Sequence, residues 1–396
     1  MKQGEAAARS RHVLVSALGV TQILAWGSSY YLPAVLAAPI AADTGWPLAS
    51  VVAGLSCGLL LAGLVSPITG RLIQRHGGRP VLAASSMLLA AAHLLMAAAT
   101  AYPLYVLAWL LMGLGMSSGL YDAGFATLGR LYGSGARGAI TNLTLFGGFA
   151  STVCWPLSAF LVEHEGWRIA CFCYAAIHLL ICLPLHLRVI PPPPPASTPA
   201  PAAAGRKQAS TSGRARTRFI LLASIQTLAA LIASMLSVHL LTLLQLRGVG
   251  LAAAVALGAL VGPSQVGARV AEMLIGRNRH HPIWTMLTSV SLLASGVWLL
   301  LASQSLTALA LILYGAGNGI HTIARGALPL VLFDPQRYAA LMGKLATPSL
   351  IMQAAAPSVG ALLLAAGGGS FVLTTLACAA TVNVGLCACL VAAVHR

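Results

Sequence analysis

The sequence predicts an all-α integral membrane protein in which twelve transmembrane helices form two pseudo-symmetric bundles of six. Hydrophobic residues make up 58% of the 396 positions and charged residues only 8%. A soluble protein of this length would need a far more charged surface. The apolar residues gather in runs long enough to cross a bilayer, and a chain in lipid must satisfy its own backbone hydrogen bonds, so we expect these runs to be helices.

A membrane-crossing helix needs about 20 mostly apolar residues, and twelve runs reach that length. The predicted spans are 13–37, 49–70, 80–100, 103–127, 139–162, 168–189, 219–243, 251–275, 283–303, 306–330, 339–365 and 370–393. Turn-forming or charged residues separate each pair. The first run is too long for a signal peptide and lacks a convincing cleavage site, so it is expected to remain as the first span.

One long interruption separates six spans from six. It contains PPPPPASTPAPAAAG and ends in the basic stretch RKQASTSGRARTR. A segment of this composition cannot bury apolar surface and should be a disordered tether. The sequence therefore predicts an N-terminal segment (1–12), a six-helix bundle (13–189), a basic proline-rich linker (190–218) and a second six-helix bundle (219–396).

Basic residues predict the orientation. If the N-terminus is cytoplasmic, only Arg168 and Arg247 fall outside the spans on the opposite side. The cytoplasmic side then carries Lys2, Arg9, Arg11, Arg71, Arg75, Arg79, Arg130, Arg137, Arg277, Arg279, Arg337, Arg396 and the basic residues of the linker. We expect a multi-pass protein of the inner or plasma membrane with both termini in the cytoplasm. The formal net charge of +16 then reflects this topology and attraction to anionic lipid, not a nucleic-acid partner.

The two halves of the sequence also resemble each other. MGLGMSSGLYDAGFATLGRLYGSGARGAI at 112–140 aligns with YGAGNGIHTIARGALPLVLFDPQRYAALM at 314–342, a shift of 202 residues. SPITGRLIQRHGGRP at 66–80 has a counterpart in GPSQVGARVAEMLIGRNRHHP at 262–282. Two matching pairs in the same order indicate an internal repeat, which is typical of transporters whose halves move about a central cavity.

The eight cysteines do not predict a disulfide or a metal site. All of them lie within apolar runs, and Cys171 and Cys173, two positions apart on a helix, point to different sides. No histidine cluster accompanies them. We interpret them as ordinary buried small residues and expect neither a metal nor a cofactor.

The hairpin GRLIQRHGGRP at 70–80 resembles the signature of the major facilitator superfamily between its second and third spans, G-x-L-x-D-R-x-G-R-R/K. The matching residues are Gly70, Leu72, Arg75, Gly77 and Arg79, whereas Gln74 replaces the acidic residue. The resemblance extends over the whole chain. It implies that this hairpin is a cytoplasmic gate element.

Within the superfamily, the sequence is most similar to the monocarboxylate porter type. RHGGRPV resembles R-F-G-x-R-P-V, YYLP at 30–33 resembles Y-A-F-P, and the stretch after Tyr132 retains a basic residue at Arg137, which we assign to the gate. Two charged positions that this type links to proton coupling differ, because Ala34 replaces a lysine and Gln265 an aspartate. The arginine of drug antiporters in the fourth span is replaced by Trp109.

A charge near the bilayer centre costs about 3 kcal/mol or more, so each charge within a span requires an explanation. In the eighth span, Gln265, Arg269 and Glu272 share one helix face. Arg269 either binds an anionic substrate, since guanidinium contacts a carboxylate with two hydrogen bonds, or pairs with Glu272 to brace the bundle.

The tenth span carries a polar stripe of Asn318, His321, Thr322 and Arg325. Tenth spans line the cavity in this superfamily, which favours substrate binding. Arg325 also lies about two turns from the cytoplasmic end, where its side chain can snorkel. His321 is either a group that titrates near neutrality or a structural hydrogen-bond donor.

Asp122 in the fourth span has two interpretations. It carries a proton through the transport cycle, or it forms a salt bridge to Arg137 or another cytoplasmic-side arginine and closes a gate. In the first span, Trp26, Tyr30 and Tyr31 are expected to line the cavity, although tyrosines also suit an aromatic belt at the membrane surface.

These observations predict a secondary transporter of a small organic solute, more specifically an organic anion such as a monocarboxylate, working by alternating access with protons as the expected coupling ion. The alternative is an exporter of a neutral or hydrophobic compound. The sequence has no H-E-x-x-H, no G-x-x-x-x-G-K-[ST] and no clustered acids, so we do not expect an enzyme. The expected partners are the solute, H⁺ and lipid, and we expect a monomer.

Overall fold

The computed structural model describes residues 2–192, 212–275 and 280–395, with side chains described from residue 11 onward. Most of the predicted linker, together with Arg277, Arg279 and Arg396, lies outside the described residues. The regular secondary structure of the described part is entirely helical, which confirms the predicted fold class. Eight stretches are long and apolar enough to cross a membrane, and some of these stretches contain more than one predicted span.

Helices α1 to α9 form the first half of the chain. They are α1 (Lys2–Ser28), α2 (Pro33–Thr44), α3 (Leu48–His76), α4 (Gly78–Ala97), α5 (Tyr102–Gly119), α6 (Tyr121–Tyr132), α7 (Arg137–Gly148), α8 (Ala150–Ile177) and α9 (Leu183–Val189). A 3₁₀ turn, Gly133–Ala136, precedes α7, and a π-helical turn, His178–Cys182, joins α8 to α9.

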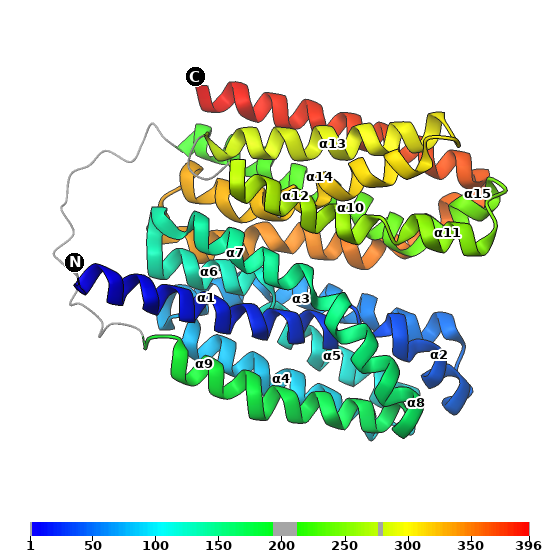
Figure 1. Ribbon diagram of the computed structural model, residues 1–396, viewed down its shortest axis with the longest axis horizontal. Coiled ribbons are helices and arrows are strands. Elements are labelled where there is room, and N and C mark those ends of the chain that lie inside the picture. Colours follow the sequence, from blue (N-terminus) through cyan, green and yellow to red (C-terminus); the bar gives the residue numbers. More distant parts are fainter. Residues whose placement is uncertain (1, 193–211, 276–279, 396) are drawn as a thin grey trace.

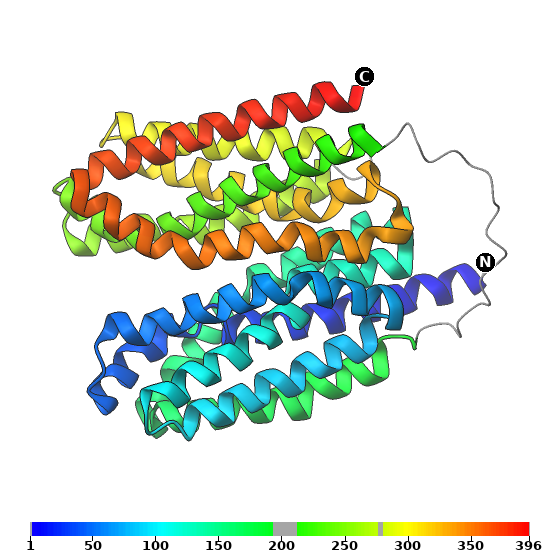
Figure 2. The same ribbon diagram turned by 180° about the vertical axis from the view of Figure 1, so that it is seen from behind.

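Helices α10 to α15 form the second half. They are α10 (Ser212–Leu246), α11 (Leu251–Gly258), α12 (Val261–Ile275), α13 (Pro282–Ala302), α14 (Thr307–Leu332) and α15 (Tyr338–His395), with a 3₁₀ turn, Pro335–Arg337, before α15. Figure 1 shows the two halves as two groups of roughly parallel helices, and Figure 2 shows the same division from behind.

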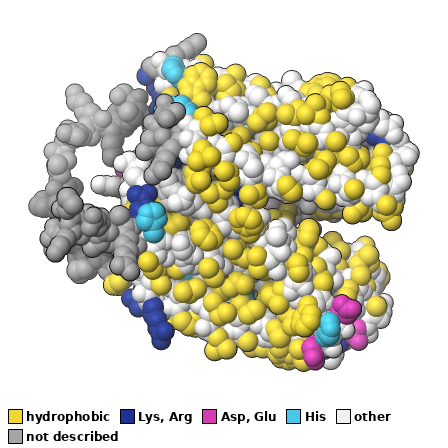
Figure 3. Space-filling model, in the orientation of Figure 1, with side chains coloured by type: hydrophobic (Ala, Val, Ile, Leu, Met, Phe, Trp, Pro, Cys, Tyr) yellow, Lys and Arg dark blue, Asp and Glu magenta, His cyan; other side chains and the backbone are white. Residues whose placement is uncertain are grey.

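Both chain termini lie at the same end of the helices, which we call the termini end (Figure 1). At the other end, which we call the opposite end, the space-filling view is hollowed between the two halves (Figure 3). The main contact between the halves is made by α3 and the first part of α15. The two halves thus meet near the termini end and separate toward the opposite end.

Several predicted spans are broken within their length. The first breaks between α1 and α2, immediately before Pro33, and the fourth breaks at Leu120, whose backbone is extended (φ −81°, ψ −169°). The fifth breaks at Phe149 and the eighth at Ala259–Leu260. Hydropathy predicts how long a span is but not where it breaks. Such breaks in transporters lie where the backbone lines a cavity or is buried in protein.

Two glycines produce the sharp reversals that separate predicted spans within a single long helix. Gly166 in α8 has φ 84° and Gly368 in α15 has φ 69°. This left-handed region is accessible to glycine at little cost. Gly166 separates the fifth predicted span from the sixth, and Gly368 separates the eleventh from the twelfth.

The hairpin between the second and third spans is shorter than predicted. Gly77, with φ 80°, is the one residue between α3, which ends at His76, and α4, which begins at Gly78. Most of residues 70–80 is therefore helical. The polar ends of these helices extend past the apolar part of each span.

The turn before α13 uses a histidine as its cap. The Nδ1 atom of His281 accepts a hydrogen bond from the backbone N–H of Ile283 at 3.2 Å. Partial burial, followed by the charges of His395 and Arg137, lowers the pKa of His281 below its ordinary value. A neutral imidazole is the form that can accept this bond, so the lowered pKa agrees with the observed cap.

Replacing Arg247 with alanine is expected to lower the melting temperature by several degrees. Its guanidinium donates to the carbonyl oxygens of Leu300 and, at 2.9 Å, Leu301, and thereby caps the end of α13. These carbonyls have no partner within their own helix, and a lost charge-assisted bond costs about 1.5–3 kcal/mol. The measurement is a thermal-shift assay in detergent. The exposed Arg214 is the control, and an equal change for Arg214→Ala would contradict the prediction.

Candidate functional site

Two ion pairs join the halves among the described residues. Asp122 of α6 pairs with Arg325 of α14, and Arg137 of α7 pairs with Glu272 of α12 at 3.5 Å. The side chains of Asp122 and Arg325 are 19% and 18% exposed. Of the alternatives for Asp122, the structure contains the salt bridge to an arginine, and that arginine is Arg325. Glu272 pairs with Arg137 rather than with Arg269.

The break at Leu120 positions Asp122. Since α5 ends at Gly119 and α6 begins at Tyr121, Asp122 lies in the first turn of a new helix. The positive end of the helix dipole favours a carboxylate there. Asp122 is thus held by a helix N-terminus on its own chain segment and by a guanidinium from the other half.

Arg269 is the most deeply placed charge of α12 and is only 5% exposed. Its Nη1 donates to the carbonyl oxygen of Thr144 in α7 at 2.9 Å, and its Nε donates to that of Gly319 in α14 at 3.3 Å. Nη2 reaches the side-chain oxygens of Gln265 at 3.3 Å and Thr322 at 3.5 Å. The guanidinium therefore lies between the two halves.

Arg269 has no acidic partner within ion-pair distance among the described residues, unlike Arg325 and Arg137. All four of its acceptors are neutral oxygens. Burying a cation without an opposite charge is unfavourable, so such a residue is expected to attract an anion. This arrangement favours the substrate-binding interpretation of Arg269 over its pairing with Glu272.

Aromatic rings lie beside Arg269. Tyr121 donates its hydroxyl to the same Thr144 carbonyl at 3.3 Å. Its ring lies 5.1 Å from that of Trp26. Trp26 in turn contacts Tyr30 at 5.4 Å and Tyr31 at 6.1 Å. The three aromatic residues predicted from the first span thus form one cluster with Tyr121. Tyr121 connects this cluster to Arg269, because both residues donate to the carbonyl oxygen of Thr144.

The remaining predicted substrate-binding residues lie on α14. Asn318 is half-buried, and the Nδ1 atom of the buried His321 lies 3.5 Å from the Ser289 hydroxyl of α13. A contact to the neighbouring helix of the same half is what a structural histidine would make. Arg325 lies one turn further along α14, where its guanidinium donates to the carboxylate of Asp122.

The predicted gate motif lies at the termini end, where the halves meet. Gln74 donates to the backbone oxygen of Gln336, just before α15. Leu72 and Arg75 are exposed and Arg79 is half-buried. Thus Gln74, which stands where the superfamily signature has an acid, contacts the other half through its side chain, as Arg137 does through its pair with Glu272.

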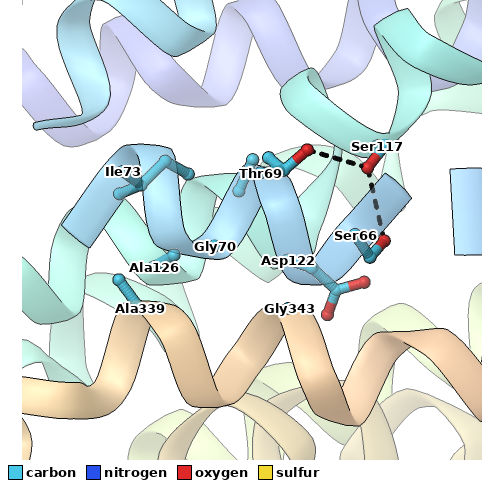
Figure 4. Close-up of a pocket in the computed structure, with 10 residues that line it drawn as sticks. Ser66, Thr69, Gly70, Ile73, Ser117, Asp122, Ala126, Ala339 and Gly343 are labelled. Carbon is cyan, nitrogen blue, oxygen red and sulfur yellow. Dashed lines mark hydrogen bonds between the residues drawn. The ribbon is translucent and has the colours of Figure 1, made fainter. Parts of the chain in front are cut away.

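The backbones of the two halves approach each other closely at two glycines, Gly70 and Gly343. A side chain at Gly70 would meet the carbonyl oxygen of Ala339, and one at Gly343 would meet that of Ser66 (Figure 4). Both neighbours are backbone atoms that cannot turn aside. Only residues without a Cβ atom allow α3 and α15 to close to this distance.

Gly343→Ala is expected to open the termini end, because its Cβ atom would overlap the Ser66 carbonyl. The measurement is disulfide formation between Gln74→Cys and Gln336→Cys in a background without the eight native cysteines. We expect the yield to fall severalfold. Gly385→Ala in the same helix, where a Cβ atom would meet nothing within 4 Å, is the control. Unchanged cross-linking in Gly343→Ala would contradict the prediction.

Sequence reasoning did not assign Tyr121 or Thr144 to the site, whereas Gln22 belongs to the polar stretch of the first span that is expected to line the cavity in part. Gln22 accepts from the Trp26 indole N–H at 3.2 Å and donates to the Gly119 carbonyl at 2.6 Å, so it orients the aromatic cluster against the α5–α6 break. The position of Tyr121 beside Asp122 was an available signal. The role of Thr144 was not predictable, because its backbone oxygen makes the contact.

Three solved structures of transporters have a similar arrangement of helices. The human organic anion transporter MFSD10 (TETRAN) superposes with a TM-score of 0.75 at 18% identity, covering 95% of this chain and 99% of that chain. The proton:xylose symporter XylE gives 0.67 at 12% identity, covering 95% of each chain. The E. coli fucose:proton symporter FucP gives 0.68 at 15%, covering 96% of this chain and 99% of that one. At these identities the likeness establishes the fold alone.

No curated protein sequence matches the chain significantly. The sequence profile of the Major Facilitator Superfamily, however, matches residues 18–357, which is most of the chain. This match includes every interior residue described above. The monocarboxylate porter type within the superfamily is not established by these comparisons. The chain is a multi-pass membrane transporter that belongs to the Major Facilitator Superfamily.

Proposed function

We propose that this transporter moves small organic anions, of the monocarboxylate kind, by secondary transport with alternating access. The observation that carries the proposal is Arg269, a buried cation between the two halves whose partners are neutral oxygens. A carboxylate accepts two parallel hydrogen bonds from a guanidinium, and this interaction is about twice as strong as a neutral hydrogen bond. The aromatic cluster from Trp26 to Tyr121 offers the apolar surface for the body of the solute.

The moving parts we propose are the bundles 13–189 and 219–396, joined by the linker 190–218. The contacts of Gln74, Gly70 and the Asp122–Arg325 pair hold the termini end closed. A hollow separates the halves at the opposite end (Figure 3), and in this proposal the solute enters there. The distribution of basic residues supports a cytoplasmic termini end in an inner or plasma membrane, so this conformer would be open to the outside.

Proton coupling through Asp122 is part of the proposal. Protonation of the carboxylate would remove its charge and weaken the pair with Arg325, so a proton would loosen the closed termini end. Ala34 and Gln265 stand where the monocarboxylate porters carry their coupling residues, whereas Asp122 is an acid within a span that forms an ion pair with an arginine of the other half. MFSD10 is described as an organic anion transporter, which supports the proposed substrate class. XylE is described as a proton:xylose symporter, which supports proton coupling on this fold.

The test is counterflow in liposomes. Vesicles with the purified protein are preloaded with unlabelled lactate, pyruvate or benzoate, and the uptake of the labelled anion is measured against protein-free vesicles. We expect trans-stimulated uptake for at least one monocarboxylate and competition by related anions. Flux of neutral solutes without flux of any anion would overturn the proposal in favour of an exporter of neutral compounds.

A further inference from the structure

Aromatic residues are scarce in this chain but gather beside Arg269. They make up only 6% of the sequence. Trp26, Tyr30 and Tyr31, at the break between α1 and α2, contact one another, and Trp26 also contacts Tyr121 of α6. Leucine or valine side chains would supply apolar surface for a solute equally well, so the use of aromatic rings at this place is informative.

The rings at the α1–α2 break meet at steep angles. The plane of Trp26 makes an angle of 69° with that of Tyr30 and 41° with that of Tyr31, and the planes of Tyr30 and Tyr31 are 86° apart. Tyr121, by contrast, is stacked on the buried Phe125, with 10° between the planes. In an edge-to-face pair, at most one ring has a face covered by its partner, so ring faces remain for a further aromatic group.

These rings lie on the inner side of the first half and reach the second half. Gln22, one turn before Trp26 on the same face of α1, is fully buried, whereas Trp26, Tyr30 and Tyr31 are half-buried. The Tyr30 hydroxyl reaches the side chain of Ser234 on α10. The accessible part of the rings therefore borders the space between the two halves rather than lipid.

Hydrogen bonds fix the orientation of the Trp26 ring. Its indole N–H donates to the side-chain oxygen of Gln22 at 3.2 Å, and the amide of Gln22 donates to the carbonyl oxygen of Gly119 at 2.6 Å. A ring that is held in place before the solute arrives loses little freedom when the solute binds, which favours affinity. Trp26 thus presents a preorganised ring face.

Arg269 has donors left for a carboxylate. Its Nη2 contacts to Gln265 and Thr322, at 3.3 Å and 3.5 Å, are long for hydrogen bonds from a guanidinium, and one of the two N–H groups of Nη1 donates to no described acceptor. The charge of Arg269 acts on the hydroxyl groups of Tyr31 and Tyr121, so both hydroxyls lie near the guanidinium. Nη1 and Nη2 can therefore bind both oxygens of a carboxylate, and a phenol hydroxyl can add a further donor.

The charge beside the rings excludes a cationic solute. Tryptophan and tyrosine rings also bind cations, but Arg269 would repel a cation, and the acid of α6, Asp122, is already paired with Arg325. The cation–π contacts among the described residues involve other arginines, so the guanidinium of Arg269 does not occupy these ring faces. The site thus combines open aromatic faces with an anion-binding group.

We propose that the solute is an aryl carboxylate. Its carboxylate binds Arg269, and its ring packs against Trp26, Tyr30 and Tyr31 in the edge-to-face or offset geometry that aromatic rings prefer. Short aliphatic acids such as lactate would make the contact with Arg269 alone and bind more weakly. The inference rests on the proposed function, because it names the solute class for the same site.

The test measures the binding of matched ligands to the purified full chain by isothermal titration calorimetry at neutral pH. Benzoate and cyclohexanecarboxylate have similar size and the same charge, but only benzoate is aromatic, and the saturated ring is the more hydrophobic of the two. We expect the Kd of benzoate to be at least about fivefold lower, which corresponds to about 1 kcal/mol. Benzylammonium has the ring with the opposite charge and is expected not to bind. Equal Kd values for the two acids, or binding of benzylammonium in preference to benzoate, would overturn the inference.

Substitutions of Trp26 assign the preference to the cluster. Trp26→Leu is expected to remove most of the preference for benzoate over cyclohexanecarboxylate, whereas Trp26→Phe keeps a ring and is expected to retain part of it. Trp298→Leu is the matched control, because Trp298 is an exposed tryptophan of α13 whose indole N–H donates to Thr381 at 2.8 Å, away from the cluster. An undiminished preference in Trp26→Leu would contradict the role of the cluster.

Counterflow separates this inference from the proposed function. If lactate or pyruvate shows counterflow and benzoate binds no better than cyclohexanecarboxylate, the aryl class is wrong and the transport of organic anions stands. If lactate, pyruvate and benzoate all fail to show counterflow, the proposed function is wrong and this inference fails with it.

Discussion

Arg269→Gln is expected to lower the transport efficiency for an organic anion by at least about 30-fold. Glutamine is long enough to keep a hydrogen bond toward the Thr144 carbonyl, but it has no charge to attract a carboxylate. Losing one partner of a buried charge-assisted pair costs about 2–5 kcal/mol, and 2 kcal/mol corresponds to about 30-fold. The measurement is the concentration dependence of counterflow in liposomes.

Two further variants make the Arg269 result specific. Arg269→Lys keeps the charge and loses the planar two-donor fork, so we expect an intermediate loss. Gln265→Ala removes a neutral partner of Arg269 and is expected to have a smaller effect than Arg269→Gln. Thermal-shift measurements check that each variant is folded. Full transport by Arg269→Gln would show that the charge does not bind the solute and would favour the export of neutral compounds.

Asp122→Asn is expected to abolish the accumulation of the labelled anion in liposomes that is driven by an imposed pH gradient (pH-driven accumulation). It is also expected to open the termini end. The variant has no ionisable carboxyl group, and Arg325 is left without its partner from the other half. Removing one member of a buried pair costs about 3–5 kcal/mol, and less for side chains that are partly exposed. We expect the closed population to fall about tenfold or more, measured by the cross-linking of Gln74→Cys with Gln336→Cys.

The charge exchange Asp122→Arg with Arg325→Asp separates the two roles of the pair. If the pair is a latch, the exchange restores part of the cross-linking that Asp122→Asn loses. Proton coupling is not expected to return, because the carboxylate then projects from α14 and no longer lies in the first turn of α6. Full pH-driven accumulation by Asp122→Asn would show that another group carries the proton.

The Asp122–Arg325 contact follows from the internal repeat, although neither residue alone predicted it. The shift of 202 residues that aligns 112–140 with 314–342 maps Asp122 onto position 324, next to Arg325. Two repeats related by a pseudo-twofold axis place equivalent spans face to face across the centre. An acid and a base at nearly equivalent positions are therefore brought together, and this signal was available before the structure.

Other contacts were not predictable from side-chain chemistry. Arg269 binds the backbone oxygens of Thr144 and Gly319, Gln74 binds that of Gln336, and Arg247 binds those of Leu300 and Leu301. Every residue has a carbonyl group, so the residue type does not mark an acceptor. The breaks at Leu120 and Phe149 are also invisible to hydropathy, because the residues around them are as apolar as the rest of the span.

The sequence by itself determined the membrane environment, the all-helical architecture and the small set of charged residues that need partners inside it. Apolar run length and backbone hydrogen bonding are local properties, and lipid imposes them on each span separately. Only the tertiary structure decided which of the described charges are paired and that Arg269 has no acidic partner among the described residues. Pairing depends on the distance between side chains that are 135 or 203 residues apart, and the packing of α3 on α15 and of α7 on α12 sets that distance.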